Sequence, residues 1–241
     1  MKVLSVIPAR GGSKGIPKKN LLKFFDFSLV GWATKTSIGC PEVSYTMIST
    51  DDDSIAADAK RFGATYLGPR PNDLSSDTAL DQPVLQFEVE RAERHFKTSF
   101  EIIVMLQPTS PLRSPEDIKI CIDKMQEYSA SSAWTISPID KHFHFKKQFT
   151  MSDDGLIEIA HKDAEVIRRQ DLEDTFRRNG AVYVFKRETV FGDPSLRGSR
   201  CVGVLLPHPT ANIDSMADFE HAKTLVEVVD SQMKFVNLEV E

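Results

Sequence analysis

The sequence has few cysteines, and none of them lie close together. Its 241 residues contain three, Cys40, Cys121 and Cys201. Because they are widely separated and form no CxxC motif, they indicate neither a disulfide framework nor a zinc site. His142 and His144 stand two residues apart, but no carboxylate or cysteine follows at ligand spacing. The sequence therefore favours surface histidines over a metal pair at that point.

Long apolar runs and an excess of positive charge are also absent. No apolar stretch reaches the roughly 18 residues that a membrane span needs, and the first strand begins too close to Met1 to leave room for a signal peptide. The formal net charge is −5, which argues against non-specific binding to nucleic acid. These absences predict a cytoplasmic protein without membrane or nucleic-acid partners, in which local basic loops must hold any anionic ligand.

The remaining composition is that of a globular α/β protein. Hydrophobic residues make up 41% and charged residues 27% of the chain, which is enough for one large core. Alternating strand and helix patterns predict a mostly parallel sheet. The expected strands are residues 3–8, 43–49, 64–67, 102–106, 133–137, 181–185 and 202–206. The expected helices are residues 29–38, 53–62, 115–128, a segment after 75–78 that ends near 96, and a last one from Ser215 to about 229.

The most informative stretch follows the first strand. Within a dozen residues it has three glycines, one serine, one arginine and three lysines. Glycines permit close backbone approach to a ligand, and successive N–H groups form an anion site beside the cations. A polyphosphate fits this loop, although neither the Walker A spelling nor the dinucleotide fingerprint matches it. An ordinary basic turn between a strand and a helix is the alternative.

Three consecutive aspartates, Asp51, Asp52 and Asp53, follow the second long strand. They are compatible with a metal site or with the negatively charged start of a helix, where the helix dipole favours them. Ile55 and Ala59 follow in helical register, so we favour the helix start for Asp52 and Asp53.

Six segments together resemble the acylneuraminate cytidylyltransferases, the CMP-sialic acid synthetases and related CMP-nonulosonic acid synthetases. They are residues 8–20, 70–79, 106–113, 168–172, 176–185 and 211–222, in the order of that family. The resemblance implies a three-layer α/β sandwich with a mostly parallel, Rossmann-like sheet. It assigns residues 1–137 and 179–232 to a nucleotidyltransferase core, 138–178 to a small dimerisation insertion and 233–241 to a tail.

The resemblance also implies an activity and its partners. A cytidylyltransferase of this family transfers CMP from CTP to the anomeric hydroxyl of a nine-carbon 2-keto acid and releases pyrophosphate. Magnesium is the implied cofactor and a homodimer the implied assembly. Two alternatives are a nucleotidyltransferase for another sugar, such as an eight-carbon ulosonate or a sugar 1-phosphate, and a non-catalytic protein that binds nucleotide sugars.

The same resemblance assigns roles to particular residues. The catalytic group is Arg10, Lys14, Lys19 and Asp214. The nucleotide-binding group is Ala9, Arg10, Gly11, Gly12, Ser13, Lys14, Asn20, Arg70, Ser76 and Thr78. The sugar-binding group is Gln107, Arg169, Gln170, Arg177 and Asn179.

Two positions depart from the family pattern. The metal motif has two aspartates separated by one residue, and here Asn212 replaces the first while Asp214 keeps the second. Asparagine offers magnesium an amide oxygen without charge. Arg178 stands where the family often has proline. We expect magnesium to be held by Asp214 and Asn212 together with phosphate oxygens.

Overall fold

The computed structural model describes residues 1–13, 15–161 and 168–233. Contacts divide the chain into two compact units, residues 1–135 with 179–241, and residues 136–178.

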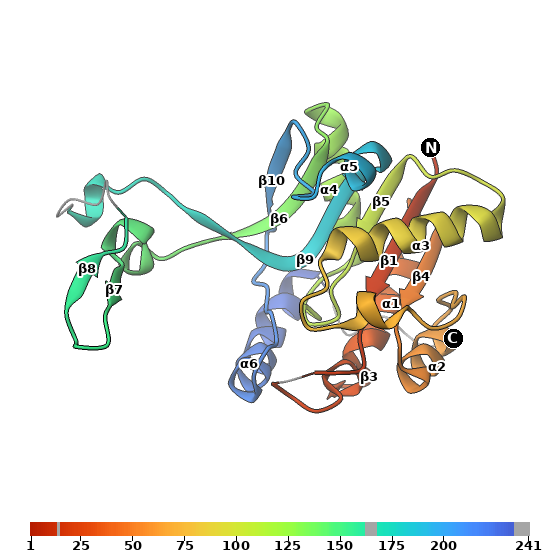
Figure 1. Ribbon diagram of the computed structural model, residues 1–241, viewed down its shortest axis with the longest axis horizontal. Helices are drawn as coiled ribbons and strands as arrows, with labels where there is room; N and C mark the ends of the chain where they lie inside the picture. The colour runs from red at the N-terminus through yellow and green to blue at the C-terminus, as the bar shows by residue number, and fades with distance from the viewer. Residues whose placement is uncertain (14, 162–167, 234–241) are drawn as a thin grey trace. The chain divides into compact units, whose positions relative to one another are not determined.

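The first unit is built on a six-stranded, mostly parallel sheet (Figure 1), which confirms the predicted α/β class. The strand order is β10-β6-β9-β5-β1-β4. β1 runs parallel to both of its neighbours, β4 and β5, whereas β9 runs antiparallel to β5. The strands of this sheet are β1 Val3–Pro8, β4 Tyr45–Ser49, β5 Ile102–Met105, β6 Ser132–Pro138, β9 Phe176–Lys186 and β10 Cys201–Leu205. A small hairpin pairs β2 Lys23–Phe24 with β3 Phe27–Ser28.

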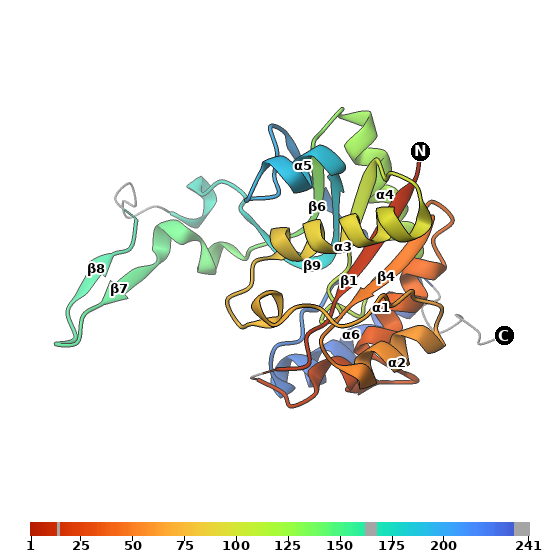
Figure 2. The ribbon, with the colours of Figure 1, turned by 45° about the vertical axis from the view of Figure 1, so that its right-hand side comes forward.

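Helices cover both faces of this sheet and make the predicted three layers (Figure 2). α3 and α5 contribute to the apolar cluster on one face, and α1, α2 and α4 contribute to the cluster on the other. A third cluster joins α6 to α1 and to the loop after β1. The helices are α1 Leu29–Ile38, α2 Asp53–Arg61, α3 Asp81–Phe96, α4 Pro115–Glu127, α5 Arg187–Gly192 and α6 Met216–Met233. No helix in the described ranges is long and apolar enough to cross a bilayer.

Side-chain caps explain where three helices begin. Asp52 accepts hydrogen bonds from the backbone N–H of Ser54 and Ile55, so it caps α2 as predicted. Ser114 and Asp117 form a capping box at the start of α4. The Ser215 hydroxyl accepts from the third residue of α6, again as predicted. Each cap satisfies backbone donors that the helix itself leaves unpaired.

The helix expected after residues 75–78 and ending near 96 is confirmed as α3, although Leu80 before it makes no side-chain cap. Two other local expectations were wrong. Residues 64–67 make only an isolated bridge, between Thr65 and Met47, instead of a strand. β9 starts at Phe176, so the segment expected as a loop before residue 181 is already extended.

The second unit contains a hairpin of β7 Phe149–Met151 and β8 Ile157–Ile159. Three 3-10 turns accompany it, at Lys141–Phe143, Phe145–Lys147 and Arg169–Asp171. All six hairpin strand residues are exposed. His142 is exposed whereas His144 is fully buried. The two imidazoles thus lie in different environments.

Candidate active site

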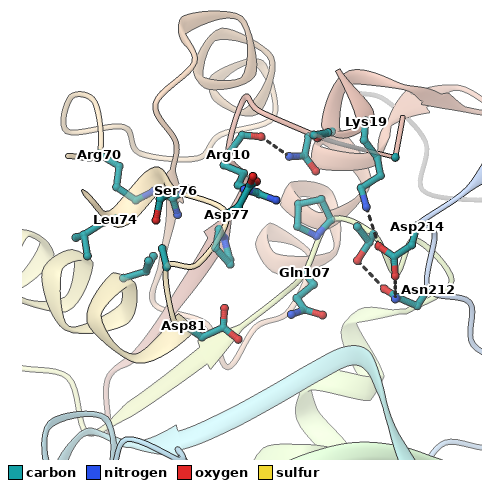
Figure 3. Close-up of a pocket in the computed structure, with 18 residues that line it drawn as sticks. Arg10, Lys19, Arg70, Leu74, Ser76, Asp77, Asp81, Gln107, Asn212 and Asp214 are labelled. Atoms are coloured by element: carbon teal, nitrogen blue, oxygen red, sulfur yellow. Dashed lines mark hydrogen bonds and ion pairs between the residues drawn. The ribbon is translucent and has the colours of Figure 1, made fainter. Parts of the chain in front are cut away.

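A cavity of about 570 Å³ lies where β1 and β5 end at the carboxyl edge of the sheet (Figure 3). Open α/β sheets place ligands at this edge. All of its lining residues belong to the first unit. They are Pro8, Arg10, Ser13, Gly15, Lys19, Asn20, Arg70, Leu74, Ser76, Asp77, Ala79, Asp81, Val84, Gln107, Pro108, Thr109, Asn212 and Asp214. Segments far apart in the sequence thus meet around one space.

Hydrogen bonds hold the loop after β1 in place. The backbone N–H of Ala9 donates to a carbonyl at the end of β4 at 2.9 Å. The N–H of Gly11 donates to Oδ1 of Asp51 at 2.8 Å. From the far end of the loop, Nδ2 of Asn20 donates to the carbonyl of Arg10 at 2.9 Å. Asp51 therefore fixes the loop after β1, while Asp52 caps α2.

The three glycines of the loop have different surroundings. A Cβ on Gly15 would lie 2.4 Å from the carbonyl oxygen of Asp214, and one on Gly11 would lie 2.9 Å from Cβ of Asp52. No atom lies within 4 Å of a Cβ built on Gly12. Gly11 and Gly15 are thus required by contacts inside the protein, and Gly12 leaves its backbone open to a ligand.

Two of the predicted cations point into the cavity, and each meets a carboxylate (Figure 3). Arg10 forms an ion pair with Asp77. Nζ of Lys19 lies 2.8 Å from Oδ1 of Asp214, and its side chain is 15% exposed. Lys14 lies outside the described residues. Because both ion pairs face the cavity, an incoming polyphosphate would compete with the carboxylates for these cations.

The segment before α3 supplies the next part of the wall. Arg70 lines the cavity although it is only 5% exposed. Burial lowers the pKa of its guanidinium, while the negative charges of Asp51 and Glu88 act in the opposite direction. Ser76 lines the cavity as well. Thr78 is exposed and does not line it, but its hydroxyl lies 3.4 Å from that of Ser76.

The loop after β5 is held from beneath by a buried arginine. Gln107 lines the cavity. Arg113, which is 1% exposed, donates to the carbonyl of Ala181 at 2.5 Å and also to the carbonyl of Gln107. Burial lowers the pKa of Arg113 to about 9, which the nearby negative charge of Asp117 opposes. A guanidinium bonded to these two carbonyls fixes the loop against β9.

Gly180 stands directly against this loop. Its φ is +78°, and a Cβ there would lie 2.6 Å from Oγ of Ser110 and 2.9 Å from Oε1 of Gln107. Gly180→Ala should therefore displace Gln107 and reduce turnover about tenfold, besides losing about 1 kcal/mol of stability to backbone strain.

Gly63→Ala is the matched control for this prediction. Gly63 has a φ of +97°, but its Cβ would make only ordinary contacts, the nearest at 3.5 Å. The control should lose similar stability in urea unfolding and keep its rate. If both variants lose the same fraction of their rate, backbone strain alone explains the loss, and displacement of Gln107 does not contribute to it.

The segment before α6 completes the cavity wall. The N–H of Ile213 donates to the carbonyl of Thr109 at 2.8 Å. The Thr109 hydroxyl donates to Oδ1 of Asn212 at 2.7 Å, and Nδ2 of Asn212 donates to Oδ2 of Asp214 at 2.6 Å. With Lys19 on its other oxygen, the Asp214 carboxylate has a positively polarised partner on each side.

The side chains of Asp214 and Asn212 fit a magnesium site that phosphate oxygens would complete. Asp214 offers an exposed carboxylate, and the amide of Asn212 can present its oxygen after a flip because the Thr109 hydroxyl can also accept. Magnesium in phosphate sites commonly takes one or two carboxylates plus phosphate oxygens. Among the described residues, no three His, Cys, Asp or Glu side chains are grouped to hold a metal without such help.

The remaining sugar-site candidates lie outside this cavity lining. Asn179 is 2% exposed, and its Oδ1 accepts from the Thr135 hydroxyl at 2.6 Å and from Ala181 N–H at 3.1 Å. Its side chain therefore bonds within the sheet and does not line this cavity. Arg177 is exposed and belongs to the second unit.

Arg169 and Gln170 also belong to the second unit. Both are exposed and form part of the 3-10 turn that ends at Asp171. Their side chains are thus accessible in the arrangement described.

Several cavity residues were not predicted. Asp77 and Asp81 place carboxylates in the wall, and Thr109 orients the amide of Asn212. Asp77 lies between Ser76 and Thr78, which were both predicted to bind the nucleotide. Its place in that segment was therefore the one sequence signal for a position near the cavity. No local sequence pattern indicates the partners that these residues find across the fold.

A parallel-sheet edge with a glycine-rich, cationic loop and a nearby carboxylate has the features of a site for the phosphates of a nucleotide and a metal ion. The family model described as Cytidylyltransferase matches residues 4–239. The chain belongs to this cytidylyltransferase family and is a nucleotidyltransferase enzyme.

Similar proteins cover nearly the whole chain. "Post-translational flagellin modification protein B" of Campylobacter coli is 28% identical over 97% of this chain and 98% of its own. The "CMP-N,N'-diacetyllegionaminic acid synthase" of Campylobacter jejuni is 30% identical over 93% of this chain and 95% of its own. The "Pseudaminic acid cytidylyltransferase" of the same species is 26% identical over 95% and 97%.

Solved structures share the fold at lower identity. A CMP:2-keto-3-deoxy-manno-octonic acid synthetase complexed with CTP gives a TM-score of 0.67 at 19% identity, covering 95% of this chain and 99% of that one. A 4-diphosphocytidyl-2C-methyl-D-erythritol synthase from Anaerococcus prevotii gives 0.61 at 14% identity, covering 94% and 96%.

Proposed function

We propose that this enzyme transfers CMP from CTP to the anomeric hydroxyl of a nonulosonic acid, a nine-carbon 2-keto acid sugar. The observation that carries this proposal is the near full-length similarity to enzymes named for legionaminic and pseudaminic acid. An N-acylneuraminate cytidylyltransferase of Streptococcus agalactiae supports it, at 28% identity over 92% of this chain and 52% of its own. We expect the enzyme to act in the cytoplasm.

In the proposed reaction, the anomeric oxygen forms a bond to the α-phosphorus of CTP. The bond from that phosphorus to the α–β bridging oxygen breaks, pyrophosphate leaves, and the hydroxyl proton is lost. The protein must mainly hold the two reactants in line and neutralise charge. Arg10, Lys19 and the hydroxyl of Ser13 line the cavity in which the triphosphate would lie. We assign Lys14 the same role from its place in the loop.

The remaining roles follow the positions of the side chains. Asn20 and Arg70 would meet the cytidine, and Gln107 would face the sugar. Asp214 and Asn212 would hold magnesium, which when bound neutralises charge on the phosphate oxygens. The carboxylate of Asp214 would then exchange its contact with Lys19 for the ion, which frees that ammonium for phosphate.

Pyrophosphate release tests the proposed activity. The enzyme is given CTP or GTP with a panel of acceptors: nonulosonic acids, an eight-carbon ulosonate, a sugar 1-phosphate, and no acceptor. Release that needs both CTP and a nonulosonic acid supports the proposal. Release with the ulosonate or the sugar 1-phosphate alone would assign another sugar, and nucleotide binding without turnover would indicate a non-catalytic protein.

We also propose that the second unit forms a homodimer contact. Its hairpin exposes large apolar side chains, with Met151 75%, Ile157 63% and Phe149 60% exposed. A two-stranded sheet is marginal in water without packing, and grouped exposed apolar side chains indicate an interaction surface. In such a dimer, Arg169 and Gln170 would reach the sugar bound to the partner.

Changing the hairpin should dissociate this dimer. We expect the double variant Met151→Lys, Ile157→Lys to be monomeric by light scattering at micromolar concentration, because each lysine would put a charge into a desolvated contact. Ile38→Lys, at a residue of the first unit that is 51% exposed, is the matched control and should remain dimeric. A wild-type monomer, or a dimer that survives the double change, would rule out this surface.

A further inference from the structure

His208 and Asp117 form a buried pair that does not line the cavity and has no part in the roles above. Both side chains are 0% exposed. Nε2 of His208 lies 3.0 Å from each oxygen of Asp117, and Nδ1 lies 3.0 Å from the carbonyl oxygen of Pro209. Two charged or polar side chains are thus withdrawn from water together.

The partners of His208 determine its protonation. A carboxylate and a carbonyl can only accept, so both ring nitrogens must donate, and only the imidazolium has two N–H groups. Burial acts to lower the pKa of His208, but the hydrogen bond and charge of Asp117, together with the Pro209 carbonyl, raise it above its ordinary value overall. The arrangement is therefore a buried ion pair.

The pair connects two segments that carry cavity residues. Asp117 is the third residue of α4, where Oδ2 also accepts from Ser114 N–H at 2.7 Å. This helix follows the loop that contains Gln107. His208 precedes Asn212 and Asp214 by four and six residues in the segment between β10 and α6. The ion pair is thus a second link between these segments, in addition to the hydrogen bond of Thr109 with Asn212.

We propose that His208 is a positioning residue, which through Asp117 holds the segment carrying Asn212 and Asp214 at the cavity. This inference rests on the proposed function for its kinetic part. A buried ion pair is costly to desolvate and often replaceable by apolar residues without loss of stability. Its presence here is explained if the site requires one fixed placement of this segment.

Two further titratable groups, Arg113 and Cys121, lie near Asp117. Arg113, in the loop before α4, is buried and interacts with the carboxylate. Cys121, one turn further along α4, is buried, and both burial and the charge of Asp117 raise its pKa. The pair thus has one buried guanidinium and one buried thiol close to its carboxylate.

The variants Asp117→Asn and His208→Gln test whether the site depends on the charge of the pair or only on its packing. The amide that Asp117→Asn introduces has no charge, but it can still cap α4 and donate to a neutral His208, so the shape is kept. We expect the imidazole of His208, followed by NMR, to titrate at lower pH in Asp117→Asn than in wild type. The magnesium concentration for half-maximal pyrophosphate release should rise about tenfold in both variants, the low end for groups that orient metal ligands.

The pH dependence has a defined sign. Because the folded pKa of His208 is raised, the pair stabilises the protein below the unfolded pKa of about 6.5 and loses this effect as pH rises through the folded pKa. In wild type, the magnesium requirement should therefore increase over the same pH range in which His208 loses its proton. In His208→Gln it should be high and independent of pH over that range.

His95→Gln is the control, since His95 is exposed on α3. It should match wild type in titration, urea unfolding and magnesium requirement. Loss of stability in Asp117→Asn and His208→Gln with an unchanged magnesium requirement would overturn the proposal and leave a purely structural pair. So would a wild-type His208 that titrates at or below its ordinary pKa. Absence of CTP turnover in wild type would instead refute the proposed function, and the NMR titration would still report the ion pair.

Discussion

Asp214→Asn should lower the turnover number by about 10²–10³-fold, the range seen when one preorganised electrostatic group is removed from an active site. Asp214 is the carboxylate that contacts Lys19, and its oxygens face the cavity. Asparagine keeps the shape but removes the charge that would attract magnesium beside the triphosphate. The initial rate is measured against magnesium concentration at saturating CTP and sugar.

Two further variants make this result specific. Asn212→Asp should lower the magnesium concentration needed for half-maximal rate, because a second carboxylate raises the charge of the site. Glu220→Gln removes an exposed carboxylate of α6 that pairs with Lys223 at 2.9 Å. It should change neither the rate nor the magnesium requirement. If Asp214→Asn keeps its rate, magnesium binds elsewhere, and Asp51 at the loop after β1 is the next candidate.

Arg10→Ala should also reduce turnover by orders of magnitude and leave the free energy of unfolding nearly unchanged. Arg10 is partly exposed and points into the cavity, where its ion pair with Asp77 contributes at most about 1 kcal/mol to stability. Its charge is instead available to the triphosphate in the transition state. The same result is expected for Lys14→Ala from its place in the loop.

Kinetics and urea unfolding are compared for this variant. Arg61→Ala serves as the control because it removes a similar ion pair, with Asp58, from an exposed position on α2. Its kinetics should match those of wild type. Near-normal turnover in Arg10→Ala, or a loss of turnover that follows a loss of stability, would contradict a role in binding phosphate.

The sequence predicted the architecture because most of its signals are local. Apolar runs such as residues 102–106 are buried on both faces of the sheet, and such runs identify central parallel strands. The capping side chains of Asp52 and Ser215 predicted where two helices begin. The short segment 64–67 has the same apolar character, but its backbone pairs only once. Strand formation there depends on neighbours that a local pattern does not contain.

Sequence motifs indicated which residues belong near the site. They did not indicate which residues contact one another across the fold. The structure places the motif residues Arg10, Lys19, Gln107 and Asp214 around one cavity. Asn179 has the same motif-based support, yet its amide bonds to Thr135 inside the sheet. The contacts of Gly15 with residue 214 and of Gly180 with residue 107 join positions far apart in sequence. Such contacts become visible only once the strands are in order.

The most direct test of the central claim follows one oxygen atom. A nonulosonic acid labelled with ¹⁸O at its anomeric hydroxyl is incubated with CTP, magnesium and enzyme, and the products are examined by ³¹P NMR and mass spectrometry. Attack by that hydroxyl on the α-phosphorus predicts a CMP-sugar that retains the label in its phosphodiester bridge, with unlabelled pyrophosphate. An unlabelled phosphodiester, label in the pyrophosphate, or CTP turnover without a CMP-sugar would contradict the account.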